Sequence, residues 1–472
     1  MTTTLTDPIA AAADAAGWWA DATPGSRRRV LAAVADALDA AADELVGLAG
    51  TESHLPEARL RGELARTTFQ LRLLGDAAAD ALEPIVDAAD PSWPAGGRPD
   101  LRRVLVPVGP VLVFAASNFP FAFSVLGGDT AAALAAGCPV VVKVHPGHPA
   151  LSARVAALAQ EAITTAGAPA GTLGLVSGVD EGVTALRDPR IAAGAFTGSP
   201  AGGRALADVA AARARPIPFY AEMGSVNPVF VTPAAARARA ETVAGGFVDS
   251  YLLGAGQFCT KPGLLFVPAS PAGDDLVAEA TRRAGARAAA PMLDDRIRDA
   301  HGAARTALVG HPAVRVLVRG AGPEDPALLT VDAATLLADP EALAAECFGP
   351  TSLVVRYRDE AELLVVARHF VGELTATVHG EPGEAVAGEL VRIAAGFAGR
   401  VLWNGWPTGV AVSHAQQHGG PYPAATGSFT SVGTTSIRRF LRPVAFQDVP
   451  DALLPPALRR ANPLGLVRRE DG

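Results

Sequence analysis

The chain has 472 residues, which is too long for one compact core and indicates two or three domains. Apolar residues make up 49% of it and charged residues 19%, a balance that supports a large buried core and argues against disorder. The net charge of −8 at pH 7 disfavours a nucleic-acid partner, because proteins that bind nucleic acids are usually basic.

Three cysteines, Cys138, Cys259 and Cys347, lie far apart, and no CxxC pair occurs. This pattern fits a reducing compartment, so we expect a cytoplasmic location rather than a disulfide scaffold. The first residues carry acids and no basic stretch, so we do not expect a signal peptide. The uncharged run 104–128 is interrupted by prolines and glycines, which favours strand, loop and helix over a membrane span.

The first part of the chain is expected to be helical. Residues 8–86 are rich in Ala, Leu and Arg at helical spacing. The Pro- and Gly-rich stretch 91–100 predicts a loop, and 101–116 predicts strands broken at Gly109. Residues 121–137 predict a further helix.

Strands and helices then alternate along the chain. We expect, in order, a strand at 138–144, a helix at 149–166, strands at 171–178 and 191–199, a helix at 202–214 and a strand at 216–225. This alternation predicts a parallel, doubly wound sheet. A second α/β region is expected from about 225 to 405, and the tail 430–448 is expected to form a hairpin or an extended arm.

Three polar residues stand out at positions suited to chemistry. Cys259 in GAGQFCTKPG is flanked by glycines that allow close approach of a ligand, and Lys261 would favour the reactive thiolate. Glu222 in FYAEMGSVNP ends an apolar strand, where an acid points into a ligand crevice and could act as a general base with a raised pKa. Asn118 in AASNFPF follows another strand and could donate to an oxyanion.

Each of these residues has a simpler interpretation from its own stretch. An inert buried cysteine, a solvated acid at a strand end and an Asn turn before Phe-Pro explain Cys259, Glu222 and Asn118 without any catalytic role. Residues 196–206 (FTGSPAGGRAL) form a glycine-rich turn opening a helix, whose free N–H groups suit a pyrophosphate, although a Ser N-cap explains the pattern equally.

Histidine pairs do not predict a metal site. His414 and His418 in HAQQH are four residues apart, but Ala stands where the zinc-protease pattern requires Glu. His145 and His148 in HPGHP flank a Pro-Gly turn and cannot share a helical face. We therefore expect no bound metal.

Six motifs in order, SNFPF, VVVKVHP, FTGS, AEMG, GQFCTKPG and ECFGP, resemble the aldehyde dehydrogenase superfamily over nearly the whole chain. The stretches AEMGSVNPVF, NGWPTGV and HGGPYPAATGS are most similar to its NADP-linked 2,5-dioxopentanoate (alpha-ketoglutaric semialdehyde) dehydrogenases. The resemblance implies an α/β aldehyde dehydrogenase fold. It implies a Rossmann-like cofactor-binding domain over 1–86 and 107–222, an α/β catalytic domain over 223–408, and a small β oligomerisation arm over 87–106 and 409–472.

The resemblance also implies that an aldehyde is oxidised to a carboxylate through a thioester. Cys259 would be the nucleophile, Glu222 the base and Asn118 an oxyanion donor. The residues implied to bind the cofactor are Lys143, Glu346, Phe348, Thr197, Gly198, Ser199, His145 and His148. Pro146 stands where the family usually has a glutamate that would repel a 2′-phosphate, so NADP is expected to be preferred and NAD to be possible.

A keto-acid aldehyde needs a cation or amide donors for its carboxylate. Arg66 and Gln70 lie one helical turn apart in GELARTTFQLR, and we expect them to form that clamp, although Arg66 could instead be a surface arginine. The residues expected to wall the substrate tunnel are Phe119, Phe121, Phe258 and Trp406. These apolar walls would equally suit a fatty or aromatic aldehyde.

Two other classes of function remain open at this point. A non-catalytic relative of the fold would not need the set Cys259, Glu222 and Asn118. A CoA-acylating dehydrogenase usually lacks the glutamate base, so Glu222 argues against it. The apolar tail is expected to pair with another subunit, which predicts a homodimer or homotetramer without a nucleic-acid or membrane partner.

Overall fold

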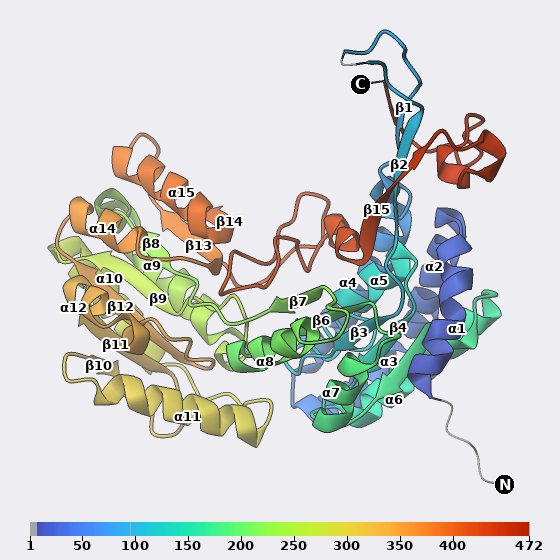
Figure 1. Ribbon diagram of the computed structural model, residues 1–472. Coiled ribbons are helices and arrows are strands. Elements are labelled where there is room, and N and C mark those ends of the chain that lie inside the picture. Colours follow the sequence, from blue (N-terminus) through green and yellow to red (C-terminus); the bar gives the residue numbers. More distant parts are fainter. Residues whose placement is uncertain (1–6, 95, 472) are drawn as a thin grey trace.

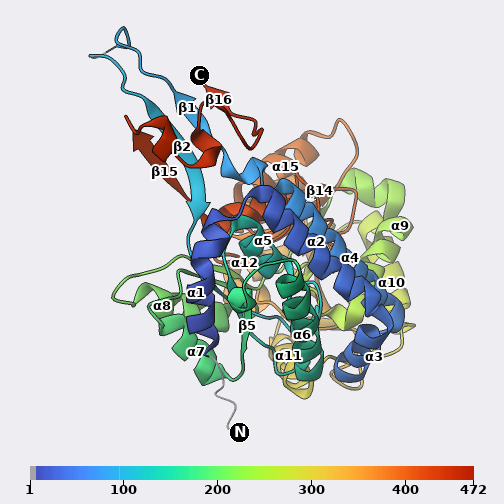
Figure 2. The ribbon, with the colours of Figure 1, turned by 90° about the vertical axis from the view of Figure 1, so that its right-hand side faces the viewer.

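The computed structural model describes residues 7–94 and 96–471. Its strands form three sheets (Figure 1). Two of them are the centres of two α/β domains that lie side by side, and the third projects from the first domain as an arm (Figures 1 and 2). Among the described residues, no helix combines the length and apolar character needed to cross a bilayer.

The first domain is built on a five-stranded sheet with the order β5-β4-β3-β6-β7, in which all neighbours are parallel. Its strands are β3 (Val111–Phe114), β4 (Val140–Lys143), β5 (Leu173–Val176), β6 (Ala193–Thr197) and β7 (Phe219–Glu222). Its helices are α1 (Pro8–Asp21), α2 (Pro24–Ala40), α3 (Ala42–Ser53), α4 (Glu57–Ala77), α5 (Gly128–Ala136), α6 (Pro149–Thr165), α7 (Val179–Arg187) and α8 (Pro200–Ala211), with 3-10 turns η1 (Asp80–Leu82) and η2 (Ala170–Thr172). The doubly wound parallel sheet is confirmed.

Helices cover both faces of this sheet, which explains why its strands are continuously apolar. Along β3, Val111 and Val113 join a core formed with α2, α4, α5 and α6. The alternate residues Leu112 and Phe114 point to the opposite face and pack with α1 and α7. The period-2 alternation therefore divides one strand between two cores.

The helix expected over 121–137 is shorter than its sequence pattern, because α5 begins only at Gly128. The buried carboxylate of Glu63 on α4 accepts the backbone N–H groups of Phe121 and Ala122 at 2.8 and 3.0 Å. A Cβ at Gly127 would fall 2.6 Å from the carbonyl oxygen of Ala122, so the chain makes a tight turn there. A carboxylate from a distant helix thus holds residues 121–127 out of the helix.

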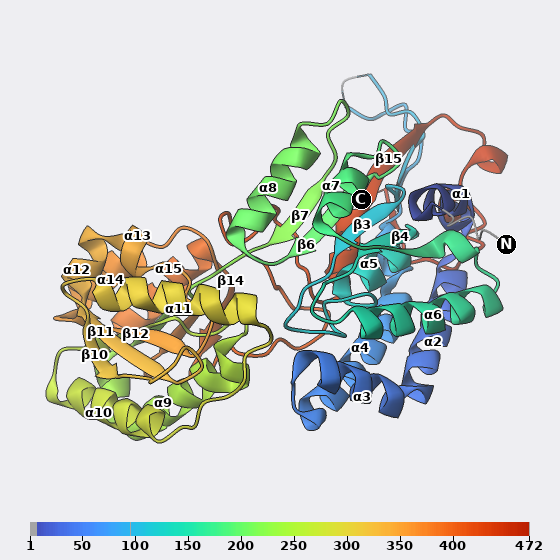
Figure 3. The same ribbon diagram turned by 90° about the horizontal axis from the view of Figure 1, so that it is seen from below.

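The second domain, at the left in Figure 3, is built on a seven-stranded sheet with the order β10-β11-β12-β9-β8-β13-β14. Its strands are β8 (Val229–Val231), β9 (Leu264–Pro268), β10 (Arg315–Val318), β11 (Ala327–Asp332), β12 (Thr351–Tyr357), β13 (Glu373–His379) and β14 (Ala398–Trp403). Its helices are α9 (Pro233–Leu252), α10 (Pro271–Gly285), α11 (Asp295–Gly310), α12 (Ala333–Ala338), α13 (Pro340–Leu343), α14 (Glu360–Ala367) and α15 (Ala385–Phe397), with the 3-10 turn η3 (Leu253–Gly256). Only the edge pair β10 and β11 is antiparallel within the described sheet.

The arm is a four-stranded sheet with the order β15-β2-β1-β16 (Figure 2). It contains β1 (Ile85–Asp87), β2 (Leu101–Pro107), β15 (Leu441–Gln447) and β16 (Arg469–Glu470), with 3-10 turns η4 (Thr434–Phe440), η5 (Asp451–Leu453) and η6 (Pro456–Leu458). Strand β15 pairs antiparallel with β2 along its whole length. The tail is therefore an extended strand added to a distant one, and it forms no hairpin of its own.

A long segment, residues 409–433, runs from the second domain back to the edge of the first sheet. Met223 N donates to Ala424 O at 2.8 Å, and Thr426 N donates to Ala221 O at 3.0 Å, so this segment packs along the end of β7. The sequence placed these residues in the arm region. Their contacts with β7 place them beside Glu222, and only the chain from η4 onward reaches the arm sheet.

Candidate active site

The carboxyl ends of the parallel strands of the first domain carry the polar residues that the sequence singled out. Asn118 follows β3, Lys143 ends β4, Thr197 ends β6 and Glu222 ends β7. In an open α/β sheet this edge is where ligands bind. The positions expected for a ligand crevice are therefore brought to one edge of one sheet.

Cys259 reaches this edge from the second domain through a left-handed turn. Gly254, Ala255 and Gly256 have φ values of 56°, 56° and 67°, a conformation that favours glycine. After the turn, Asn227 Nδ2 donates to the carbonyl oxygen of Cys259 at 2.8 Å and to that of Lys261 at 3.0 Å. The backbone on both sides of the thiol is thus fixed.

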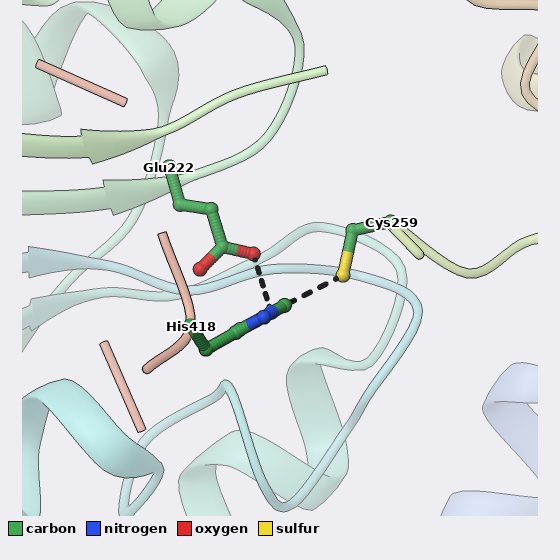
Figure 4. Close-up of side chains that lie close together, drawn as sticks. All are labelled: Glu222, Cys259 and His418. Carbon is green, nitrogen blue, oxygen red and sulfur yellow. Dashed lines mark hydrogen bonds and ion pairs between the residues drawn. The ribbon is translucent and has the colours of Figure 1, made fainter. Parts of the chain in front are cut away.

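Cys259, Glu222 and His418 converge in the site (Figure 4). His418 Nε2 lies 3.5 Å from Cys259 Sγ and 3.0 Å from Glu222 Oε1. Ser431 Oγ donates to Glu222 Oε2 at 2.5 Å. A thiol, an imidazole and a carboxylate therefore share one pocket, at distances that allow proton transfer.

The electrostatics of this pocket correct one expectation. Burial raises the pKa of the Glu222 carboxyl, but the charge of His418 and the hydrogen bonds that Glu222 accepts outweigh burial, so the net shift is downward. A raised pKa had been expected for Glu222, and that expectation was wrong in sign. Burial and the carboxylate of Glu222 raise the pKa of the Cys259 thiol well above its usual value.

Lys261 does not assist the thiol, contrary to expectation. Its ammonium group is buried and donates to the carbonyl oxygens of Cys347 and Thr351 at 2.6 and 2.7 Å. Two buried carbonyls are good partners for a compact cation. Lys261 therefore joins the loop of Cys259 to the loop that carries Glu346.

Asn118 lies against the same loop as the thiol. Its Nδ2 donates to the carbonyl oxygen of Gln257 at 3.0 Å, two residues before Cys259. Arg59 Nη2 donates to the carbonyl oxygen of Asn118 at 2.7 Å and holds the backbone there. The amide thus lies beside the loop of Cys259 in space, although it is far from that loop in sequence.

The residues expected at the cofactor lie around the strand ends. Ser199 accepts from Gly202 N and caps α8, and Gly198 N donates to the carbonyl oxygen of Glu222 at 3.0 Å. His148 is buried and bonded to Ala116 O and Ser152 Oγ, which makes it part of the scaffold of that loop. Burial, followed by the neighbouring charges of His148 and Lys143, lowers the pKa of His145 to about 3, so its ring is neutral.

Glu346 and Phe348 come to this region from the second domain, on the loop between α13 and β12. A Cβ at Gly224 would fall 2.2 Å from Glu346 Oε2, so the carboxylate lies directly on the backbone after β7. Burial raises the pKa of Glu346 to about 7. Phe348 packs against the core of the first domain, and the loop therefore connects the two domains at the site.

Arg66 is half-buried, and its guanidinium lies near enough to the thiol for their charges to interact. Its guanidinium lies over the ring of Phe123 at 5.3 Å, and its charge acts on both Cys259 and Glu222. Arg66 Nη1 is buried and has no hydrogen-bond partner among the described residues. Gln70 is buried one turn further along α4, against Gly128.

The aromatic residues expected in the tunnel wall lie in three separate places. Phe119 and Phe258 meet edge to face at 5.2 Å, and Arg59 lies over both rings. Phe121 is buried in the core of the first domain. Trp406 packs on His379 at 4.6 Å in the second domain.

Sequence reasoning missed His418 and Ser431 as members of the site. His418 was considered only as a metal ligand with His414, on the assumption of helical spacing, but residues 411–418 form no helix. The one local signal was the Gly-Gly pair after His418, which lets the chain approach β13 closely. One side-chain atom from each of Cys259, Glu222 and His418 lies within 4.8 Å of the other two.

The comparisons with known proteins agree with this geometry. A sequence profile described as "Aldehyde dehydrogenase family" matches residues 2–301. The chain is 45% identical to "Alpha-ketoglutaric semialdehyde dehydrogenase 2" of Azospirillum brasilense, over 96% of this chain and 89% of that protein. It is 42% identical to "Alpha-ketoglutaric semialdehyde dehydrogenase" of Acinetobacter baylyi, over 95% of this chain and 87% of that protein.

Among solved structures, the fold is similar to that of 1-pyrroline-5-carboxylate dehydrogenase from Thermus with bound NAD. The TM-score is 0.78 at 23% sequence identity, covering 93% of this chain and 84% of that chain. The two-domain α/β architecture expected from the resemblance is thereby confirmed.

Proposed function

Because this chain belongs to the aldehyde dehydrogenase family, we propose that it oxidises alpha-ketoglutaric semialdehyde to the dicarboxylate 2-oxoglutarate, with NADP as the preferred cofactor. Two relatives that share more than 40% of its residues over nearly its whole length carry the name of that activity. The chemistry follows from the residues at the edge of the first sheet.

Cys259 is the nucleophile, and its thiolate attacks the aldehyde carbon. Asn118 Nδ2 and the backbone N–H of Cys259 stabilise the oxyanion, where one such donor is typically worth about 3 kcal/mol. A bound nicotinamide would serve as the hydride acceptor. Cys259 is then a thioester, and Glu222 takes a proton from the water that hydrolyses it. The lowered pKa of Glu222 keeps this base ionised at neutral pH.

The residues present fit a dinucleotide. Helix α8 begins directly after β6, and its N-terminal N–H groups and dipole suit a pyrophosphate. Lys143 ends β4 at the same edge, and burial and the positive charge of Arg296 lower its pKa. Lys143 and Glu346 would hold the nicotinamide ribose, with Phe348 beside the ring. Pro146 leaves residues 144–148 without an acid, which supports NADP.

The observation that carries the substrate assignment is Arg66. A buried guanidinium nitrogen without a partner, close to the nucleophile, is a costly arrangement that a substrate carboxylate would relieve. We assign Arg66 to the carboxylate of the keto acid, with Gln70 behind it. The paired rings of Phe119 and Phe258 wall the aldehyde end, and they favour a fatty or aromatic aldehyde as the second candidate substrate.

The substitution Arg66→Ala tests this assignment. With alpha-ketoglutaric semialdehyde, kcat/KM should fall by about 10- to 100-fold, because a charged hydrogen bond contributes about 1.5–3 kcal/mol. With hexanal, which has no carboxylate, kcat/KM should change less than about twofold. Arg61→Ala on the same helix removes an exposed arginine and is the matched control. An equal loss on both aldehydes in Arg66→Ala would overturn the clamp.

We also propose a cellular compartment and an oligomeric state for the protein. The three cysteines are all unpaired, which supports a reducing compartment such as the cytoplasm. The projecting arm supports a homodimer or homotetramer, as argued below.

A further inference from the structure

We propose that His418 is the proton acceptor that converts the Cys259 thiol to the thiolate, which leaves Glu222 free for hydrolysis. The inference rests on the assignment of Cys259 as the nucleophile. It gives a catalytic role to a residue on the 409–433 segment, far in sequence from both partners.

The direction of the imidazole favours this role. His418 Nε2 lies 3.5 Å from Cys259 Sγ, and this contact has hydrogen-bond geometry. Glu222 Oε1 is closer, at 3.0 Å, but this contact is an ion pair that lacks the hydrogen-bond geometry of the contact with the sulfur. The in-plane nitrogen thus aims at the sulfur, and the carboxylate lies beside it at ion-pair distance (Figure 4).

The thiol needs such an acceptor. Burial and the charge of Glu222 hold its pKa well above the usual value, so an isolated Cys259 would be almost entirely protonated at neutral pH. If Glu222 took the thiol proton, it would be protonated when the thioester needs a base to activate water. With two acceptors, His418 takes the thiol proton and Glu222 takes the proton of the hydrolytic water.

The proton transfers balance as follows. The S–H bond of Cys259 breaks, and an N–H bond forms at Nε2 of the neutral ring, so the positive charge of His418 that lowers the pKa of Glu222 is present after this transfer. The resulting imidazolium lies between the thiolate and the Glu222 carboxylate, which stabilises its positive charge. When the thioester is hydrolysed, the water proton passes to Glu222, the C–S bond breaks, and the leaving thiolate takes the proton back from His418. Glu222 then releases its proton to solvent.

The fold holds the backbone of His418 in place for this exchange, and the ring Nδ1 has no hydrogen-bond partner among the described residues. His418 is fully buried. The backbone N–H of His418 donates to Thr430 Oγ1 at 2.7 Å, and its backbone carbonyl oxygen accepts from Ser431 N at 2.7 Å. The Phe123 ring lies 6.5 Å away on one side. The other charged groups that act on the thiol or on Glu222 are Arg66 of α4, Arg400 of β14 and Glu346.

The rate of Cys259 alkylation by iodoacetamide, measured against pH without cofactor or aldehyde, tests the inference. In the wild type, the rate should rise with pH to an inflection set by the pairing of Cys259 with His418. In His418→Asn, the inflection should move upward by at least one unit, and the rate at pH 7 should fall by at least about tenfold. Glu222→Gln should keep the inflection of the wild type, and His414→Asn, an exposed histidine four residues away, should match the wild type.

The outcomes separate this inference from the proposed function. A normal alkylation profile in His418→Asn, or an upward shift of the inflection in Glu222→Gln alone, would show that Glu222 takes the thiol proton. If Cys259 of the wild type is not alkylated at any pH while aldehyde is still oxidised, the nucleophile assignment itself fails. Should His418→Asn not fold, His418→Gln takes its place, and an inflection equal to that of the wild type would overturn the inference.

Discussion

Two carboxylates of the site show how neighbours decide the behaviour of a buried acid. Burial raises the pKa of both Glu222 and Glu346. Glu222 has His418 and Ser431 as partners, and its net shift is downward. For Glu346, burial outweighs the positive charge of Lys261, the negative charge of Glu373 adds to the effect of burial, and the pKa rises to about 7. One acid is therefore kept ionised as a base, and the other changes protonation near neutral pH.

Pro146 carries the prediction on cofactor choice. Pro146→Glu puts an acid where it can accept hydrogen bonds from the adenosine ribose hydroxyls and repel a 2′-phosphate. The ratio of kcat/KM for NADP over NAD should exceed one in the wild type. It should fall by about 10- to 100-fold in the variant, which corresponds to about 1.4–2.8 kcal/mol.

The control for cofactor choice is Pro146→Gln, because a glutamine side chain is similar in size to glutamate but carries no charge. Its ratio should stay near that of the wild type, because the repulsion comes from the carboxylate. Steady-state rates at limiting cofactor give kcat/KM for NADP and for NAD in each variant. A wild type that strongly prefers NAD would refute the prediction.

At the scale of single residues, the sequence predicts those that lie within a recognisable contiguous motif. Cys259, Glu222 and Asn118 were found in this way, and the fold brings them to one place. His418 was not, because its role depends on where the 409–433 segment runs, and nothing local encodes that path. The direction of the Glu222 pKa shift and the true partners of Lys261 also depend on residues distant in sequence.

The turn before Cys259 is the element on which the site depends most. Gly256 has φ 67°, and a Cβ there would fall 2.1 Å from the carbonyl oxygen of Gly349. Gly349 follows the loop of Glu346 and Phe348. One tight backbone contact therefore sets the distance between the nucleophile loop and the cofactor loop.

Gly256→Ala should separate these two loops. The left-handed conformation alone costs an alanine about 1 kcal/mol, and the backbone clash adds to it. We expect kcat/KM to fall by about 100-fold, since displacements of about 1 Å cost that much, and the thermal midpoint to drop by several degrees. Gly285→Ala at the end of α10, where a Cβ meets nothing within 4 Å, is the control. Retention of activity within twofold in Gly256→Ala would contradict this account.

Elements are predictable where their signal is periodic and local. The alternation of strands and helices predicted the first sheet and its parallel order, because buried parallel strands are continuously apolar. The helix at 121–137 was predicted too long, because Glu63 of α4 takes the N–H groups at its start. A pattern within one segment cannot report a hydrogen bond from another.

At the scale of the whole molecule, the arm is the feature that a single chain does not explain. Its sheet has β15 at one edge and only a small core on one face, formed by residues such as Val104, Phe446 and Leu458. The register places Leu105 opposite Pro443 and Arg103 opposite Ala445, on the other face of the same two strands. Leu105 is half-buried, and Pro443 and Ala445 are exposed. A long edge strand with an apolar open face is a surface that proteins normally cover.

We therefore expect this face to be covered by a second copy of the chain, and Leu105→Glu to weaken that association by at least about tenfold, because it buries an unpaired charge in the contact. Analytical ultracentrifugation over a range of micromolar concentrations should show a dimer or tetramer for the wild type and a shift toward monomer for the variant. Val179→Glu makes the same change at an exposed apolar position on α7, away from the arm, and should sediment like the wild type. A wild type that is monomeric throughout this range, or an equal shift in both variants, would rule out the arm as the interface. If Leu105→Glu becomes monomeric yet keeps its kcat with the aldehyde, the site is complete within one chain, as the convergence of Cys259, Glu222 and His418 in a single chain requires.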